Sequence, residues 1–127
     1  MNTPVSDGTL VPARSPWIHE RLHAYQVALD FYKLATVIRR GLPRGLGSLG
    51  DQLGRAAQSI CLNLAEGAAS RSRAIKMRCW DIAAGSACEC AAALDVVEVE
   101  NGAGAALIAQ ARDRLRLTTL LIAGLRR

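Results

Sequence analysis

The spacing of apolar residues between positions 49 and 64 constrains this chain more than any other feature. The apolar residues recur at steps of three and four, at Leu49, Leu53, Ala56, Ala57, Ile60 and Leu64. Such spacing places them on one face of an α-helix. Asp51, Arg55, Ser59 and Asn63 fall on the opposite face, where Asp51 and Arg55 are one turn apart and able to pair. We therefore predict an amphipathic helix with one buried face.

Small residues mark the expected ends of this helix. Ser48 is a predicted N-cap, because its hydroxyl can accept a hydrogen bond from a free N–H of the first turn. Gly67 is expected to take the left-handed conformation that closes a helix near Glu66. A turn over residues 67–70 then leads into a third helix from about Ser72.

A first helix is predicted from about Trp17 to Arg40, and the glycine-rich residues 41–50 break it. Its main stripe is predicted to be Leu22, Tyr25, Leu29, Tyr32 and Thr36. Four more residues widen the apolar surface: Val27, Phe31, Leu34 and Ile38.

The third and fourth helices repeat the same spacing. The third has a predicted stripe of Ile75, Cys79, Ile82, Ala83, Ser86, Cys90, Ala93 and Val97, and it is expected to end at Asn101 and Gly102. The fourth presents Ile108, Ala111, Leu115, Thr118, Ile122 and Leu125, which alternate by three and four as in a bundle seam. Four leucines lie off that seam, at Leu107, Leu117, Leu120 and Leu121. Either a broad internal face or subunit contact would cover this excess on the first and fourth helices, and subunit contact is favoured.

These patterns predict an all-α fold. The aromatic content of 4% and the abundance of alanine and leucine favour helices over sheet. Four helices with short connections imply an antiparallel, up-down-up-down four-helix bundle over residues 17–127. Residues 1–16, with three prolines, are expected to form a flexible tail.

Cysteine usage and hydropathy bear on location. The four cysteines stand in a chain without a signal-peptide pattern, which predicts reduced thiols in a cytoplasmic protein. No window reaches the roughly twenty apolar residues of a membrane helix. Cys88 and Cys90 point in different directions on a helix, so they are expected not to share a metal ion.

Two short motifs match enzyme signatures. Residues 19–23 spell H-E-x-x-H, the pattern of zinc proteases, but the chain has no further histidine and no further glutamate before Glu66 to complete a ligand set. Residues 45–50 spell G-x-G-x-x-G, but a helix rather than a strand precedes them. We therefore predict no catalytic residues, no metal and no cofactor. Zinc-dependent hydrolysis is kept only as a third alternative.

The segment QLGRAAQSICLNLAEG, residues 52–67, resembles the signature helix of the four-helix-bundle proteins encoded by intervening sequences of 23S ribosomal RNA genes. Ala28, Tyr32 and IAAGSACE at 82–89 add supporting matches. Cys61 departs from the family pattern, which usually has proline there, so a straighter second helix is expected. The matched structural residues include Arg55, Asn63, Glu66, Gly67 and Glu89.

The resemblance implies a left-handed bundle that assembles as a homo-oligomeric ring, a pentamer. A related branch, the accessory variability determinant proteins of diversity-generating retroelements, serves as an accessory subunit to reverse transcriptases. In that branch a basic ring surface contacts nucleic acid.

Charge is distributed unevenly along the chain. Residues 39–78 contain eight basic residues and two acids, whereas residues 81–100 contain five acids and no base. Glu66 opposes the helix dipole, so it is expected to have a partner in Arg55, Arg73 or a neighbouring subunit.

These charges suggest a non-enzymatic interaction protein that binds RNA or DNA by backbone charge. The predicted contacts are Arg39, Arg40, Arg44, Arg71, Arg73, Lys76 and Arg78. Alternatively, the protein is a structural or protein-binding scaffold whose charges pair its subunits.

Overall fold

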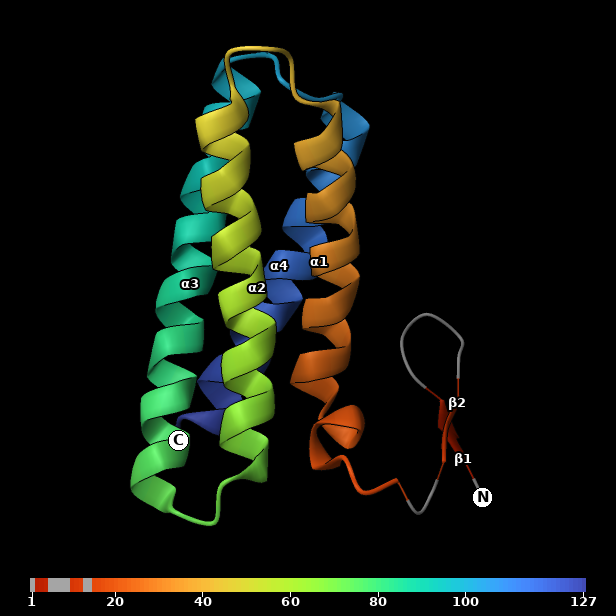
Figure 1. The fold of residues 1–127 in the computed structure, drawn as a ribbon, viewed down its shortest axis with the longest axis vertical. Coiled ribbons are helices and arrows are strands. Elements are labelled where there is room, and N and C mark those ends of the chain that lie inside the picture. Colours follow the sequence, from red (N-terminus) through yellow and green to blue (C-terminus); the bar gives the residue numbers. More distant parts are fainter. Residues whose placement is uncertain (1, 5–9, 13–14) are drawn as a thin grey trace.

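The computed structural model describes residues 2–4, 10–12 and 15–127, and four long helices dominate it (Figure 1). They are α1 (His23–Gly41), α2 (Gly47–Ala69), α3 (Arg73–Val99) and α4 (Ala105–Leu125). A short 3-10 helix, η1 (Ile18–Arg21), precedes α1. The four-helix prediction is therefore confirmed. The first helix, expected from Trp17, is instead split into η1 and α1, because Leu22 between them is extended.

Two three-residue strands precede the helices. β1 (Asn2–Pro4) and β2 (Leu10–Pro12) pair antiparallel, with Thr3 opposite Val11. The predicted flexible tail thus contains a strand pair that the all-α prediction did not include. The remaining positions up to residue 14, namely 1, 5–9 and 13–14, lie outside the described residues.

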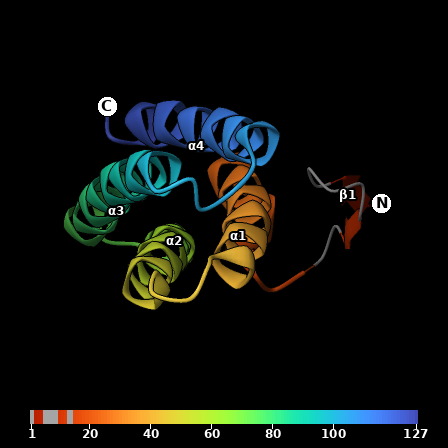
Figure 2. The ribbon, with the colours of Figure 1, turned by 90° about the horizontal axis from the view of Figure 1, so that it is seen from above.

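The helices pack as neighbours around one core. α1 packs on α2 and α4, and α3 packs on the same two helices (Figure 2). The α1–α2 and α3–α4 connections lie at one end of the molecule, and the α2–α3 turn lies at the other with the C-terminus (Figure 1). Residues from the start of α1, the end of α2, the start of α3 and the end of α4 therefore meet at the α2–α3 end.

The buried faces of α2 and α4 follow the predicted stripes, with Leu49 and Leu125 only half-buried. The prediction for α1 was partly wrong, because its predicted main stripe is only half-buried, whereas three of the four residues expected to widen the apolar surface, Val27, Phe31 and Ile38, lie in the core. Its core side is made of Ala24, Val27, Ala28, Phe31, Ala35 and Ile38. Ala24, Ala28 and Ala35 were not in the predicted stripe, and their small side chains allow α1 to approach its neighbours closely.

The prediction for α3 was partly wrong. Ile75 and Ile82 are 47% and 41% exposed, so they do not belong to the core. The buried residues of α3 are Cys79, Trp80, Ala83, Ala87, Cys90, Ala93, Leu94 and Val97. From Trp80 to Val97 this buried series keeps steps of three and four, through positions that are mostly alanine.

Gly67 does not end α2, contrary to the prediction. The helix continues to Ala69, and Gly67 is a buried helical residue. A Cβ atom at Gly67 would lie 2.7 and 2.8 Å from two ring atoms of Trp80 and 3.0 Å from the Cβ of Cys79. Gly67 is therefore required by the close packing of α2 against α3 and not by a left-handed turn.

Two side chains, those of Ser72 and Lys76, cap the helix ends at the α2–α3 turn. Ser72 is the N-cap of α3, and its hydroxyl accepts a hydrogen bond from the backbone N–H of Ile75 at 3.2 Å. The Nζ of Lys76 donates to the carbonyl oxygens of Gly67 at 2.8 Å and Ala68 at 3.3 Å. These are carbonyls that the end of a helix leaves without an intrahelical partner. At the other end of α2, the predicted N-cap Ser48 lies inside the helix and Leu46 is the N-cap residue.

We predict that Gly67→Ala lowers the free energy of unfolding by about 1–3 kcal/mol, because the added methyl group collides with the buried Trp80 ring. Chemical denaturation followed by circular dichroism measures the change. Gly124→Ala in α4 is the matched control, since a Cβ there has no heavy atom within 4 Å. A loss of similar size in both variants would contradict the steric explanation.

Candidate functional site

The seven predicted basic residues fall into two groups at opposite ends of the molecule (Figure 1). Arg39, Arg40 and Arg44 belong to the end that holds the α1–α2 connection. The other group surrounds the α2–α3 turn and is called here the basic α2–α3 end: Arg71, Arg73, Lys76 and Arg78. The two groups are separated by the length of the helices, so they cannot form one continuous patch on a single chain.

The first group is mixed in role and in charge. Arg39 is half-buried and crosses two glycines of α2, since a Cβ at Gly54 would lie 3.0 Å from its terminal nitrogen and one at Gly50 would lie 3.1 Å from its Cγ. Its side chain therefore has a packing role. Glu98 and Glu100 from the end of α3 also lie at this end of the molecule.

The basic α2–α3 end is more uniformly positive. Arg71, Arg73 and Arg78 are exposed and form no ion pair with any residue in the described ranges. Lys76 is half-buried and holds the last carbonyls of α2, as described above. Three guanidinium groups on adjoining turns are thus available to an external anion.

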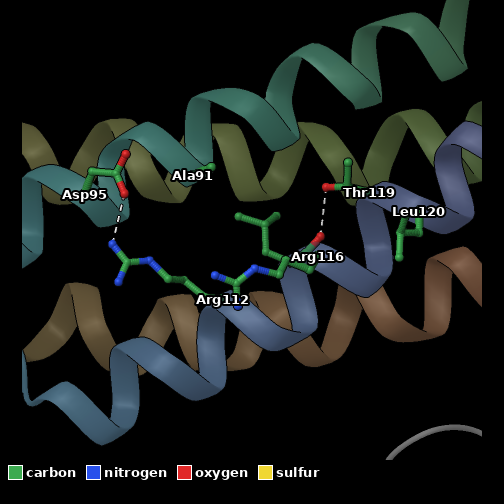
Figure 3. Close-up of a pocket in the computed structure, with 7 residues that line it drawn as sticks. Ala91, Asp95, Arg112, Arg116, Thr119 and Leu120 are labelled. Carbon is green, nitrogen blue, oxygen red and sulfur yellow. Dashed lines mark hydrogen bonds and ion pairs between the residues drawn. The ribbon is translucent and has the colours of Figure 1, made fainter.

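In contrast, Arg112 of α4 and Arg126, which directly follows this helix, are paired within the chain. Arg112 donates to Asp95 at 2.9 Å and to Glu98 at 3.0 Å, and Figure 3 shows it reaching Asp95 across the space between α4 and α3. The hydrogen bond to Glu98, and to a lesser degree that to Asp95, raises the pKa of the Arg112 guanidinium above its ordinary value. Arg126 pairs with Asp81 at 2.9 Å. The acids of α3 are therefore largely engaged by α4.

A groove of about 410 Å³ lies between α3 and α4 beside this ion pair (Figure 3). Ala91 and Leu115 contribute to its apolar lining, and Leu120 beside them is 68% exposed. The Thr119 hydroxyl, also in the lining, donates to the Leu115 carbonyl at 2.8 Å. Most of the exposed surface of the lining is apolar, so the groove is suited to apolar contact.

Most exposed large apolar residues of α3 lie along one stripe. Ile75, Ile82 and Val96 are separated by multiples of seven residues, and Val99 follows three residues later. Their exposed fractions lie between 41% and 79%. Gly85 lies on the same stripe, and a Cβ added there would meet no heavy atom within 4 Å. The uncovered apolar surface is therefore concentrated on α3, whereas the sequence had pointed to α1 and α4.

Of the five matched structural residues, Gly67 is buried and Asn63 is half-buried, whereas three are exposed: Arg55, Glu66 and Glu89. The Asn63 side-chain amide donates to the Ser59 carbonyl at 2.8 Å and to its hydroxyl at 3.2 Å, and Ser86 of α3 donates to the same hydroxyl at 2.7 Å. This network joins α2 to α3.

The expected intrachain partners of Glu66 are not present. Neither Arg55 nor Arg73 forms an ion pair with Glu66 within the described part of the chain, and Glu66 is exposed. Asp51 and Arg55 likewise do not pair there, although they are one turn apart. A partner for Glu66 on a neighbouring subunit stays a prediction.

The H-E-x-x-H motif does not form the helical turn that zinc proteases require. His19 and Glu20 lie in η1, His23 begins α1, and Leu22 between them is extended with ψ 115°. The rings of His19 and Tyr25 pack edge to face, with 4.7 Å between their centroids. The Glu20 carboxylate accepts a hydrogen bond from the Ser15 hydroxyl at 3.0 Å. Among residues 2–4, 10–12 and 15–127, no group of three His, Cys, Asp or Glu residues is placed to hold a metal ion.

The cysteines are free thiols, and three of them are buried. Burial raises the pKa of the Cys61 thiol to about 11 and that of Cys90 to about 12. The pKa of Cys79 is raised by burial and, to a lesser degree, by Glu66. Cys88 is exposed on α3. The buried thiols therefore serve as small apolar side chains.

Comparison with protein families identifies the chain. The family model described as 23S rRNA-intervening sequence protein matches residues 20–119. The chain belongs to this family. The match covers η1 from Glu20, all of α1, α2 and α3, and most of α4, so it agrees with the resemblance carried by residues 52–67 and 82–89. A comparison with curated proteins gave no match.

The family match assigns no function to individual residues, so the candidate site is identified from the positions and contacts of the side chains. None of the helices in the described ranges is both long enough and apolar enough to cross a bilayer. The clearest chemical features are the unpaired arginines of the basic α2–α3 end and the exposed apolar stripe of α3. Sequence reasoning missed the Arg112 ion pairs and the α3 stripe.

We predict that Ellman's reagent at pH 8 modifies one thiol per folded chain rapidly, and that Cys88→Ser abolishes this phase. The thiolate is the reactive form, and burial keeps Cys61 and Cys90 protonated. Because folding raises the pKa of these two thiols from 9.0, their protonation favours the folded state. This contribution to the free energy of unfolding is complete below about pH 9 and is lost as the pH rises toward 11–12. Rapid modification of two or more thiols in native protein would contradict this assignment.

Proposed function

We propose that this protein is a non-enzymatic accessory protein of the cytoplasm, which assembles with copies of itself and binds the phosphate backbone of RNA or DNA. The observation that carries the proposal is the set of exposed arginines at the basic α2–α3 end that have no carboxylate partner among the described residues. Four free cysteines suit a reducing compartment. The left-handed arrangement, the ring of five and a reverse-transcriptase partner remain implications of the family resemblance.

The exposed stripe of α3 supports self-assembly. Ile75, Ile82 and Val96 recur at heptad spacing, which is the spacing of helix-to-helix seams. Gly85 on this stripe leaves room for a second backbone to approach closely. A second copy is the favoured occupant because a repeated contact of this kind closes a symmetric oligomer.

Repetition of the chain in a ring would strengthen weak anion binding. Each subunit would contribute Arg71, Arg73 and Arg78, and several such groups would engage one polyanion at high effective concentration. Binding by backbone charge is sequence-independent and weakens steeply with salt, because each neutralised phosphate releases counterions.

The alternative is a scaffold in which acids and bases of neighbouring subunits pair. The engagement of Asp81, Asp95 and Glu98 by arginines of the same chain weakens this alternative, because few acids of α3 remain for a neighbour. Glu89 of α3 and Glu100 directly after α3 are left without an ion pair among the described residues. Charge pairing between subunits would make assembly itself sensitive to salt.

We predict that the double variant Ile82→Lys and Val96→Lys reduces the assembly to a species near the 13.6 kDa mass of one chain, with unchanged helix content. Light scattering and circular dichroism measure the two properties. Val37→Lys with Leu62→Lys is the matched control, since these residues are exposed on α1 and α2. A monomeric parent protein, or equal dissociation in both doubles, would contradict the α3 contact.

We predict that Arg71→Gln, Arg73→Gln and Arg78→Gln together weaken binding to RNA or DNA and lower the slope of log affinity against log salt by about 2 to 3. Lys76 is retained because it caps α2. The matched control neutralises three exposed arginines elsewhere: Arg40, Arg44 and Arg114. Oligomer mass should be the same in both variants. Undiminished binding in the first triple, or an equal loss in the control, would overturn the assignment to this end.

A further inference from the structure

A pocket of about 430 Å³ opens at the α2–α3 end of the bundle. Four segments that are distant in sequence line it: Leu22 follows η1, Ala68 lies in the last turn of α2, Met77 lies near the start of α3 and Leu125 is the last residue of α4. The volume lies within the range of small-molecule sites, roughly 300–1,000 Å³. Because this pocket depends on the folded bundle, no single motif in the sequence indicates it.

The charged residues that line this pocket are all cations. They are Arg21, Arg73 and Lys76, and no carboxylate takes part in the lining. Arg73 is exposed and forms no ion pair within the described ranges. Lys76 uses two of its three N–H groups on the carbonyls of Gly67 and Ala68, which leaves one for a ligand. The rim is thus matched to an anionic group.

The rest of the lining is apolar. Met77 and Trp80 of α3 face Leu22 and Leu125 around the pocket. Trp80 is only 5% exposed and its ring packs against Gly67, so it offers little free ring surface to a ligand. The half-buried Met77, Leu22 and Leu125 supply the accessible apolar surface, and a thioether is a good partner for the face of an aromatic ring. A ligand that combines an anion with a flat ring would satisfy both parts of the site.

We propose that this pocket binds a nucleotide, with its phosphate on Arg73 and Lys76 and its base against Met77 and Leu125, beside the buried Trp80. The nucleotide is either free or an unstacked nucleotide of a single strand, and only the second source rests on the proposed function. A duplex keeps its bases stacked and cannot supply one without paying the cost of flipping it. The site therefore favours single strands over duplexes of equal charge.

The fluorescence of Trp80 reports directly on the pocket. Trp17→Phe leaves Trp80 as the only tryptophan of the chain. In this background, adenosine monophosphate, a single-stranded oligo(dA) and an oligo(dA)·oligo(dT) duplex of the same length are titrated separately, with inorganic phosphate as a further probe. We expect saturable quenching by the single strand or by the mononucleotide, and at least about tenfold weaker quenching by phosphate and duplex.

Two variants test the geometry. Met77→Glu places a carboxylate among the apolar residues and should weaken nucleotide affinity about tenfold or more, whereas the exposed Arg73→Gln should weaken it without any risk to folding. Thr119→Glu in the α3–α4 groove is the control and should leave affinity unchanged. Circular dichroism checks that Met77→Glu is folded, and Arg73→Gln decides the question if it is not.

The outcomes separate this proposal from the proposed function. Equal, salt-dependent binding of single strand and duplex without quenching of Trp80 overturns the pocket but leaves backbone binding intact. Quenching by adenosine monophosphate without retention of any nucleic acid supports the pocket and removes the proposed function. Absence of quenching by all probes, or equal affinity in Arg73→Gln and the parent, overturns the nucleotide site.

Discussion

The contact between Gly67 and the Trp80 ring is the constraint on which the α2–α3 half of the molecule depends. With no side chain at Gly67, α2 runs on to Ala69 against α3, and the two helices stay close enough for the Ser59 and Ser86 hydroxyls to bond at 2.7 Å. The same approach brings the last carbonyls of α2 to the ammonium group of Lys76. The position of the basic residues is therefore a consequence of packing in the core.

Much of the fold could be predicted from spacing alone, because apolar steps of three and four report burial directly in α2 and α4. The same rule failed where small residues form the interface. Ala24, Ala28 and Ala35 lie on the core side of α1, but the stripe predicted for that helix contained only larger side chains. Gly67 was misread for a related reason, since a glycine near a helix end indicates a turn and a close approach equally well.

Only part of the candidate site could be predicted from the sequence. Charge counts found the basic residues, but they could not tell that Arg39 packs across Gly50 and Gly54 or that α4 engages the acids of α3. A signal for the latter existed. Consecutive antiparallel helices bring together residues equally distant from their connection, as with Asp81 and Arg126 or Asp95 and Arg112 around residues 103–104.

The internal pairing of α4 with α3 has an electrical consequence. Compensation along these two helices leaves Arg71, Arg73 and Arg78 without a carboxylate partner among the described residues where α2 turns into α3, whereas the opposite end mixes the arginines of α1 and the α1–α2 connection with Glu98 and Glu100. This uneven distribution gives the molecule a dipole moment along its long axis. A diffusing polyanion would therefore rotate the protein before contact, which raises the association rate at low ionic strength and disappears as the Debye length shortens.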